Sequence, residues 1–176
     1  MSYSNLLPEQ KTVVFGDAQN GEITRHTIVA VIVDEQTGKY LCQYWQEYSG
    51  LTCLLSGGVE GNENPDEALL REIREETGYD DFTVVGILGA NIESHYVKAD
   101  GTRFKKIITP YLVTLHSQSG VDTSKEEDEK FDNLFMESSE IIELMNKYED
   151  TTGSTLGDHK EILGRGIAYL KSLSPL

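Results

Sequence analysis

The stretch that decides the fold is residues 57–79, GGVEGNENPDEALLREIREETGY. Its second half predicts a helix over about 65–77, because Asn64 is a favourable N-cap and Pro65 suits the first helical position. Gly78 follows the last turn, where glycine commonly ends a helix. The first half, with the preceding serine, predicts a Gly-rich loop over 56–63.

Three glutamates share one face of this predicted helix. At 100° per residue, Glu72, Glu75 and Glu76 fall within about 100° of one another, beside an apolar stripe that includes Leu69 and Ile73. Like charges at this spacing destabilise a helix, and a hard divalent cation with oxygen ligands would remove the repulsion. A solvated surface helix rich in glutamate gives the same pattern, so the helix alone leaves both interpretations open.

The glycines before the helix favour the cation. Gly57, Gly58 and Gly61 permit close backbone approach, and the amides at a helix N-terminus suit phosphate or metal contacts. A Gly-rich loop that leads into a helix with three carboxylates therefore indicates a metal site that handles phosphate groups.

This segment resembles the Nudix box, G-x5-E-x7-R-E-U-x-E-E-x-G-U, where U is a bulky aliphatic residue. The positions in register are Gly57, Glu63, Arg71, Glu72, Ile73, Glu75, Glu76 and Gly78. Tyr79 departs from the pattern, since it is aromatic at the last U position. The resemblance implies a Nudix-type mixed β-sheet sandwich flanked by helices, with the box as a loop–helix–loop, and hydrolysis of a diphosphate linkage.

The rest of the chain predicts strands and helices in a compatible order. Strands are expected at 11–15, 23–34, 39–45, 51–55, 82–89, 91–98, 103–115 and 131–136, and further helices near 138–148 and 158–173. This order, without regular βαβ alternation, predicts an α/β (α+β) fold. A length of 176 residues favours a single domain over 1–176, with an N-terminal strand extension over about 1–22 and a C-terminal helix over about 158–173.

Composition and charge limit the partners. The formal net charge of −15 argues against a long nucleic acid, but a small phosphorylated substrate can bind through bridging cations. The longest apolar run, residues 28–33, is far shorter than the ~20 residues of a membrane span, and the N-terminus lacks a secretory signal pattern. We therefore expect a cytoplasmic protein without membrane contact. Cys42 and Cys53 indicate no disulfide framework.

The resemblance also implies roles for the box residues. Glu72, Glu75 and Glu76 would bind Mg²⁺ or Mn²⁺, with the backbone carbonyl of Ser56 as a further ligand. The catalytic set would include Glu75, Glu76 and Arg71. Arg71 also pairs with Glu63 to brace the loop, and the structural residues of the box would be Glu63, Gly57 and Gly58, which shape the turn, and Gly78, which ends the helix.

The general base is left open between two regions. In different branches of the family it is a box glutamate or a glutamate of a later loop, and the acidic run at 125–130 offers Glu126, Glu127 and Glu129. A charge run is usually only a solvated loop.

Flanking features give conflicting indications of the substrate. The strand at 11–15, the strand end at 43–45 and the sequence LLSGGVE resemble the ADP-ribose and nucleotide-sugar pyrophosphatases, in which the N-terminal strand often forms part of a homodimer. That branch typically has a proline about sixteen residues after the box, and residues 92–97 contain none. Tyr96, seventeen residues after Tyr79, instead resembles a tyrosine of the dinucleoside polyphosphate hydrolases.

Four residues are candidates for substrate contact, namely Tyr44, Trp45, His95 and Tyr96. Their aromatic rings could stack on a base, although packing within strands explains such residues equally well. We expect a nucleoside diphosphate linked to another moiety, as in ADP-ribose or a nucleotide sugar. The alternatives are a dinucleoside polyphosphate or nucleoside triphosphate substrate, a non-catalytic nucleotide sensor and an isoprenoid diphosphate isomerase; the complete box favours a hydrolase.

Overall fold

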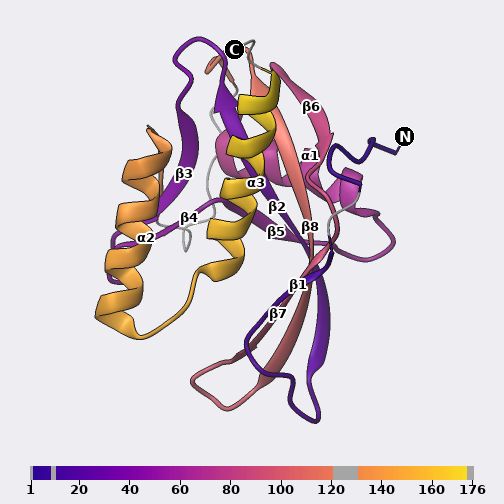
Figure 1. Cartoon of the computed structure of the whole chain (residues 1–176), viewed down its shortest axis with the longest axis vertical. Coiled ribbons are helices and arrows are strands. Elements are labelled where there is room, and N and C mark those ends of the chain that lie inside the picture. Colours follow the sequence, from indigo (N-terminus) through magenta and orange to yellow (C-terminus); the bar gives the residue numbers. More distant parts are fainter. Residues whose placement is uncertain (1, 9–10, 121–130, 174–176) are drawn as a thin grey trace.

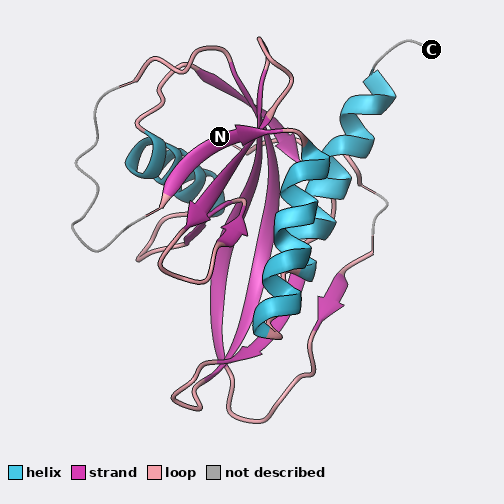
Figure 2. Ribbon diagram, turned by 90° about the vertical axis from the view of Figure 1, so that its left-hand side faces the viewer, coloured by secondary structure: helices cyan, strands magenta, loops and turns pink. Residues whose placement is uncertain are grey.

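The computed structural model describes residues 2–8, 11–120 and 131–173, and these build a nine-stranded mixed sheet with helices on both faces (Figures 1 and 2). The strands are β1 (Val13–Phe15), β2 (Ile23–Asp34), β3 (Tyr40–Trp45), β4 (Leu51–Cys53), β5 (Leu55–Gly58), β6 (Phe82–Ile87), β7 (Ile92–Val97), β8 (Arg103–Leu115) and β9 (Asp132–Met136). The helices are α1 (Pro65–Thr77), α2 (Ser138–Thr152) and α3 (Gly157–Leu173). No helix in these ranges is long and apolar enough to cross a membrane.

The centre of the sheet is a long parallel pair. β2 runs beside β8 along its whole length, from Ile23 opposite Phe104 to Asp34 opposite Leu115. The sheet order is β1-β7-β8-β2-β3-β4, while β5 pairs with β2, β6 with β8 and β9 with β3. Residues 28–33 of β2 lose polar alternation because both faces of the sheet are covered there.

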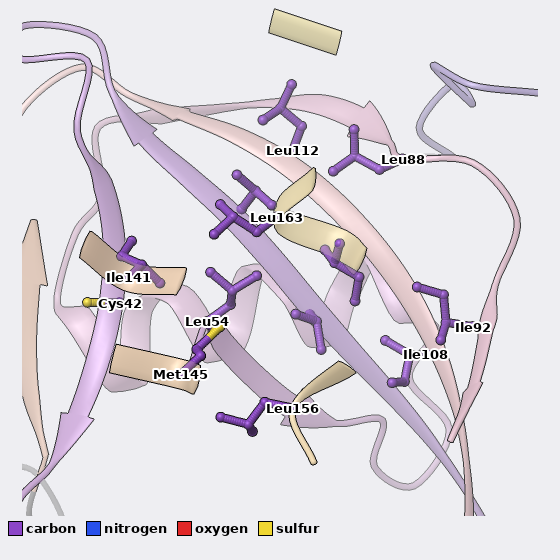
Figure 3. Close-up of a cluster of buried hydrophobic side chains, with 13 residues drawn as sticks. Cys42, Leu54, Leu88, Ile92, Ile108, Leu112, Ile141, Met145, Leu156 and Leu163 are labelled. Atoms are coloured by element: carbon purple, nitrogen blue, oxygen red, sulfur yellow. The ribbon is translucent and has the colours of Figure 1, made fainter. Parts of the chain in front are cut away.

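Alternate residues of β2 face two separate cores. Ile28 and Ala30 pack with Leu69 and Ile73 of α1, on what we call the α1 face. Val29 and Val31 pack in the cluster beneath α2 and α3, on what we call the α3 face. Figure 3 shows this cluster. The sheet therefore carries α1 on one side and the two C-terminal helices on the other, as a sandwich of this kind requires.

The caps of α1 agree with the sequence. Asn64 accepts hydrogen bonds from the amides of Asp66 and Glu67, and Glu67 returns a capping-box bond to the Asn64 amide. Gly78 ends the helix with φ of +73°, in the left-handed region that favours glycine. The second helix extends further than expected, to Thr152, and ends at Gly153.

The predicted boundary between residues 51–55 and the Gly-rich loop is wrong. β4 stops at Cys53, and Leu55–Gly58 forms a separate strand that pairs with β2, so residues 56–58 are strand rather than loop. Glycines in a strand commonly mark a close approach by another element. In this chain the glycines led to the prediction of a loop where the structure has a strand.

A buried histidine occupies the break between β4 and β5. The amide of Leu54 belongs to neither strand, and it donates to Nδ1 of His159 at 3.3 Å. Burial lowers the pKa of His159, so the ring is neutral and Nδ1 acts as the acceptor. Asp158 accepts from the His159 amide at 2.9 Å and thereby fixes the start of α3.

The N-terminal segment pairs with the body of the same chain. Val13 to Phe15 lie parallel to residues 92–94 of β7, which makes the predicted strand at 11–15 a three-residue edge strand. Before it, the Leu6 amide donates to the Ile87 carbonyl and the Ile87 amide to the Ser4 carbonyl. The segment thus extends the sheet at one edge and packs beside β6.

Candidate active site

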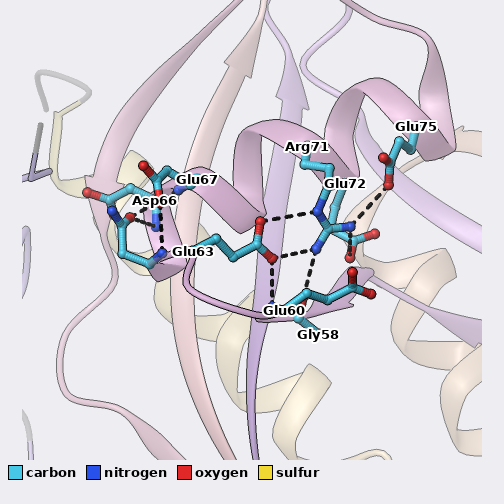
Figure 4. A network of polar contacts seen from close by, with 9 residues as sticks. Gly58, Glu60, Glu63, Asp66, Glu67, Arg71, Glu72 and Glu75 are labelled. Atoms are coloured by element: carbon cyan, nitrogen blue, oxygen red, sulfur yellow. Dashed lines mark hydrogen bonds and ion pairs between the residues drawn. The ribbon is translucent and has the colours of Figure 1, made fainter.

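Arg71 stands at the centre of the acidic residues of the box (Figure 4). Its guanidinium donates two hydrogen bonds to the carboxylate of Glu63, at 2.7 and 3.2 Å. The same group donates to Glu72 at 2.8 Å, to Glu75 at 3.0 Å and to the carbonyl of Gly58 at 2.8 Å. Arg71 therefore ties the loop, the end of β5 and α1 together, and the hydrogen bond from Arg71 lowers the pKa of Glu63.

Gly57 lets α1 lie directly against β5. A Cβ atom at this position would stand 1.9 Å from Cδ of Glu72, which no side chain could share. Glu72 is only 8% exposed, and this burial raises its pKa despite the bond from Arg71. A carboxylate in this position gains from a nearby cation, because its charged form is poorly solvated.

Glu76 bonds different residues from those that bond Glu72 and Glu75. Its Oε2 accepts from Nε2 of Gln43 at 2.6 Å, and its backbone carbonyl accepts from Nδ2 of Asn133 at 2.8 Å. In the described ranges, no three acidic, histidine or cysteine side chains form a ready-made metal cluster. Glu72 and Glu75 bond Arg71, and Glu76 bonds Gln43. The donors nevertheless fit Mg²⁺ or Mn²⁺, which prefer a few carboxylate oxygens and retain waters.

A cleft of about 540 Å³ lies on the opposite side of β5. Its lining includes Arg25, Thr27, Gly58, Tyr96 and Lys106. Arg25, Thr27 and Lys106 alternate with residues of the α1 core, so these side chains belong to the α3 face. Because Gly58 lacks a side chain and a Cβ there would meet nothing within 4 Å, the cleft is open up to the strand itself.

Two cationic side chains of this cleft lie over aromatic rings. Tyr96 and Phe104 stack with centroids 5.3 Å apart, on neighbouring strands. The Lys106 ammonium lies 5.0 Å above the Tyr96 ring, and the Arg25 guanidinium 4.6 Å above Phe104. Within the described residues neither Arg25 nor Lys106 forms a salt bridge, so both charges remain available to an anion.

The four candidate substrate residues are divided between different places. Tyr96 lines the cleft, whereas His95, next to it in β7, points to the α1 face and is 4% exposed. The ring of His95 contacts Glu22 at 2.9 Å and lies 3.8 Å from Glu93. These contacts give His95 a structural setting between two carboxylates, away from the cleft.

Tyr44 and Trp45 lie on β3, outside the lining of the cleft. Trp45 packs on Phe131 with ring centroids 4.7 Å apart and on Tyr48 at 5.6 Å. A Cβ on Gly50 would lie 3.4 Å from the Tyr44 hydroxyl, so that ring covers the turn after β3. Both residues take part in packing around this end of the sheet.

The acidic run at 125–130 held the other candidates for the general base. Glu126, Glu127 and Glu129 lie outside the described residues. On either side of that stretch, Gly120 bridges to Tyr79 beside the end of α1, and Phe131 stacks on Trp45.

Sequence reasoning missed the partners that come from distant strands. Arg25, Lys106 and Asn133 were not among the candidate residues, and Gln43 was included only in the strand end at 43–45. The only available signal was their parity: each shares a face with residues that the core or the helix uses. Which face each would occupy depended on pairings far apart in the sequence.

Comparisons with known proteins agree with this geometry. The NUDIX domain family model matches residues 24–153. No curated protein sequence matches the chain significantly. Among solved structures, an Ap4A hydrolase from C. elegans is similar with a TM-score of 0.59 and 17% identity, covering 85% of this chain and 99% of its own.

Two other solved structures are similar at this level. The dihydroneopterin triphosphate pyrophosphohydrolase of E. coli has a TM-score of 0.56 and 16% identity, over 81% of this chain and 94% of its own. An ADP compounds hydrolase has a TM-score of 0.54 and 14% identity, over 89% and 78%. Such identities establish the common fold, while the family model covers most of the chain: the chain belongs to the NUDIX domain family.

Proposed function

We propose that this Nudix hydrolase cleaves a diphosphate linkage in a nucleoside diphosphate joined to a second moiety, as in ADP-ribose or a nucleotide sugar. One observation carries the proposal: β5 has the box carboxylates on one side and a cation-lined cleft on the other. A substrate with a central diphosphate and a group at each end has the shape to lie across this strand.

The box residues provide the ligands for Mg²⁺ or Mn²⁺. Glu72, Glu75 and Glu76 would hold the ion together with the carbonyl of Ser56, and their hard oxygen donors suit it. When bound, such an ion neutralises the diphosphate and generates the attacking hydroxide from water. Arg71 keeps the ends of the loop and the helix in register, through its bonds to Glu63 and Gly58.

The cleft would hold the rest of the substrate. Arg25 and Lys106 can each pair with a phosphate oxygen, and both are already held over aromatic rings, which limits the entropy lost on binding. Tyr96, which lines the cleft, would contact the base or sugar. The general base is a box glutamate or one of Glu126, Glu127 and Glu129.

A second candidate substrate is a dinucleoside polyphosphate or a nucleoside triphosphate. The two cations of the cleft, which form no salt bridge with the described residues, favour it, because a longer phosphate chain brings more negative charge beyond the cleaved bond. The C. elegans Ap4A hydrolase has the same fold, which is compatible with this substrate.

The deciding experiment is turnover with Mg²⁺ or Mn²⁺ across ADP-ribose, nucleotide sugars, diadenosine polyphosphates and nucleoside triphosphates, with products identified by mass. The matched control is the Glu75→Gln/Glu76→Gln variant. We expect cleavage in the wild type and its loss in the control. A wild type that binds Mn²⁺ and nucleotide without turnover would make the chain a sensor and refute the proposal.

We also propose that the edge strand β1 forms a homodimer contact. β1 has one sheet neighbour, β7, and Val14 on it is 55% exposed. Light scattering should give twice the mass of the chain, and Val14→Lys should return it to the single mass. A wild type of single mass at all concentrations would refute this contact.

A further inference from the structure

Two polar side chains from neighbouring strands grip the same glutamate of α1. Gln43 of β3 and Asn133 of β9 are directly opposite each other in the sheet. Gln43 is only 2% exposed and donates to the Glu76 carboxylate at 2.6 Å. Asn133 donates to the backbone carbonyl of the same residue at 2.8 Å.

The two bonds fix different parts of Glu76. The carbonyl belongs to the last turn of α1, where carbonyls lack a partner within the helix, so Asn133 holds the end of the helix against the sheet. Gln43 holds the side chain and selects its direction. Glu76 is therefore held at both its backbone and its carboxylate. Among the described residues, the exposed Glu75 is held only by Arg71.

The orientation of the Asn133 amide supports this assignment. Its Oδ1 is buried without a hydrogen-bond partner in the described part of the chain, whereas its Nδ2 bonds Glu76. Turning the amide over would set two carbonyl oxygens against each other. The amide thus leaves its Oδ1 without a partner among the described residues, and its Nδ2 donates to Glu76.

The chemistry of the donor matters as much as its place. Arg71 supplies a positive charge to Glu63, Glu72 and Glu75, and a guanidinium competes with a metal ion for carboxylates. Gln43 is neutral, so its hydrogen bond orients the Glu76 carboxylate without adding a positive charge that competes with a metal ion. Its bond uses one carboxylate oxygen, Oε2.

We propose that Gln43 and Asn133 form a clamp that positions Glu76 for a divalent cation. The proposal rests on the metal dependence of the proposed function. Gln43 and Asn133 are positioning residues in this scheme: they contact a metal ligand, and neither touches the substrate. Removing a residue that hydrogen-bonds a metal ligand typically lowers the metal affinity of a site by about 10–100-fold.

The test is the affinity of the full chain for Mn²⁺, measured from the electron paramagnetic resonance signal of free Mn²⁺. We expect Gln43→Leu to weaken Mn²⁺ binding about 10–100-fold. The half-saturating Mn²⁺ concentration for turnover should rise in parallel, with kcat approaching the wild-type value at saturation. The matched control is Cys53→Ala, since Cys53 is buried opposite Gln43 on the other neighbouring strand. This variant should lose stability and keep its Mn²⁺ affinity.

Several outcomes separate the clamp from the proposed function. A folded Gln43→Leu variant with Mn²⁺ affinity within about twofold of the wild type overturns the clamp, whatever the turnover. If Gln43→Leu does not fold, Asn133→Asp replaces it: weaker Mn²⁺ binding supports the clamp and unchanged binding overturns it. A wild type that binds Mn²⁺ tightly and hydrolyses nothing refutes the enzyme, while the same affinities still decide the clamp. A wild type that binds no Mn²⁺ refutes both.

Discussion

The two sides of β5 carry opposite charges although they belong to one four-residue strand. On the α1 face, Gly57 lies against the buried carboxylate of Glu72, which bonds an arginine that holds three acids. On the α3 face, Gly58 borders a cleft with Arg25 and Lys106 over aromatic rings. The strand alternation that normally separates core from solvent here separates an acidic side from a basic side.

The two glycines differ in what their missing side chains allow. At Gly57 the absent Cβ makes room for Glu72, so the residue sets a distance between strand and helix. At Gly58 the space is open, so the residue leaves access to the strand. Neighbouring glycines of one motif thus act through different physical effects, packing in one case and access in the other.

The largest effect should come from the acidic side. Glu72→Gln keeps the shape of the buried side chain and removes its charge. Turnover should fall about 10³-fold, because a bound metal lowers the barrier by several kcal/mol and each 1.4 kcal/mol is about tenfold in rate. Burial raises the pKa of Glu72, so the metal-free variant should be as stable as the wild type or more so. Initial rates and thermal unfolding without metal check both points. Equal rates for the two proteins would remove Glu72 from the site.

The glycine pair offers a sharper contrast. Gly57→Ala should lower the free energy of unfolding by about 1–3 kcal/mol, since its Cβ must displace Glu72 or α1. Gly58→Ala, one residue away, should change stability by less than about 0.5 kcal/mol because its Cβ meets nothing. Urea unfolding of both variants measures this difference. Similar losses for the two would mean that β5 does not have the two distinct sides described.

The basic side should affect substrate binding. Lys106→Gln should raise KM about tenfold with little change in kcat, because a charged hydrogen bond is worth about 1.5–3 kcal/mol in the bound and transition states alike. Lys105→Gln is the matched control: Lys105 is the next residue, points to the α1 face and pairs with Glu93 at 2.8 Å. Its KM should match the wild type. If both variants raise KM equally, general charge rather than the cleft attracts the substrate.

The smallest effect concerns the break before β5. Burial depresses the pKa of His159 in the folded protein, so the unfolded chain takes up a proton near pH 6.5 before the folded chain does. The stability due to neutral His159 is therefore present above about pH 6.5 and lost as the pH falls. His159→Asn keeps an acceptor for the Leu54 amide and cannot titrate, so its stability should fall less between pH 7 and 5. Parallel unfolding curves for both proteins over this range would contradict the assignment.

The sequence predicted what depends on local patterns. The caps at Asn64 and Gly78, the apolar stripe of α1 and the long strand at 23–34, buried over 28–33, were all predicted, because each follows from residues close together in the sequence. The motif around Arg71 and Glu72 likewise indicated the family.

The rest depended on pairings that sequence patterns do not encode. The separation of His95 from Tyr96 follows from strand alternation, but the face that each side chain would take was set by β8 and by the turn that carries Glu22. The strand at Leu55–Gly58 was hidden because glycine is a poor strand former, and only the approach of Glu72 explains its presence. The cleft joins Arg25 to Lys106, residues brought together only by the parallel register of two strands.

The parallel pair of β2 and β8 has a consequence for how the protein folds. β2 ends at Asp34 and β8 begins at Arg103, so the whole box lies within the loop of chain that this pairing closes. Contacts of such high sequence separation are slow to form, and domains that they dominate fold in milliseconds to seconds. α1 can form early from its own caps, whereas the cleft arises only when the register of the central strands is set. The box glutamates would then reach their final positions late, because Glu72 packs on β5 and Glu76 bonds Gln43 and Asn133 of two further strands.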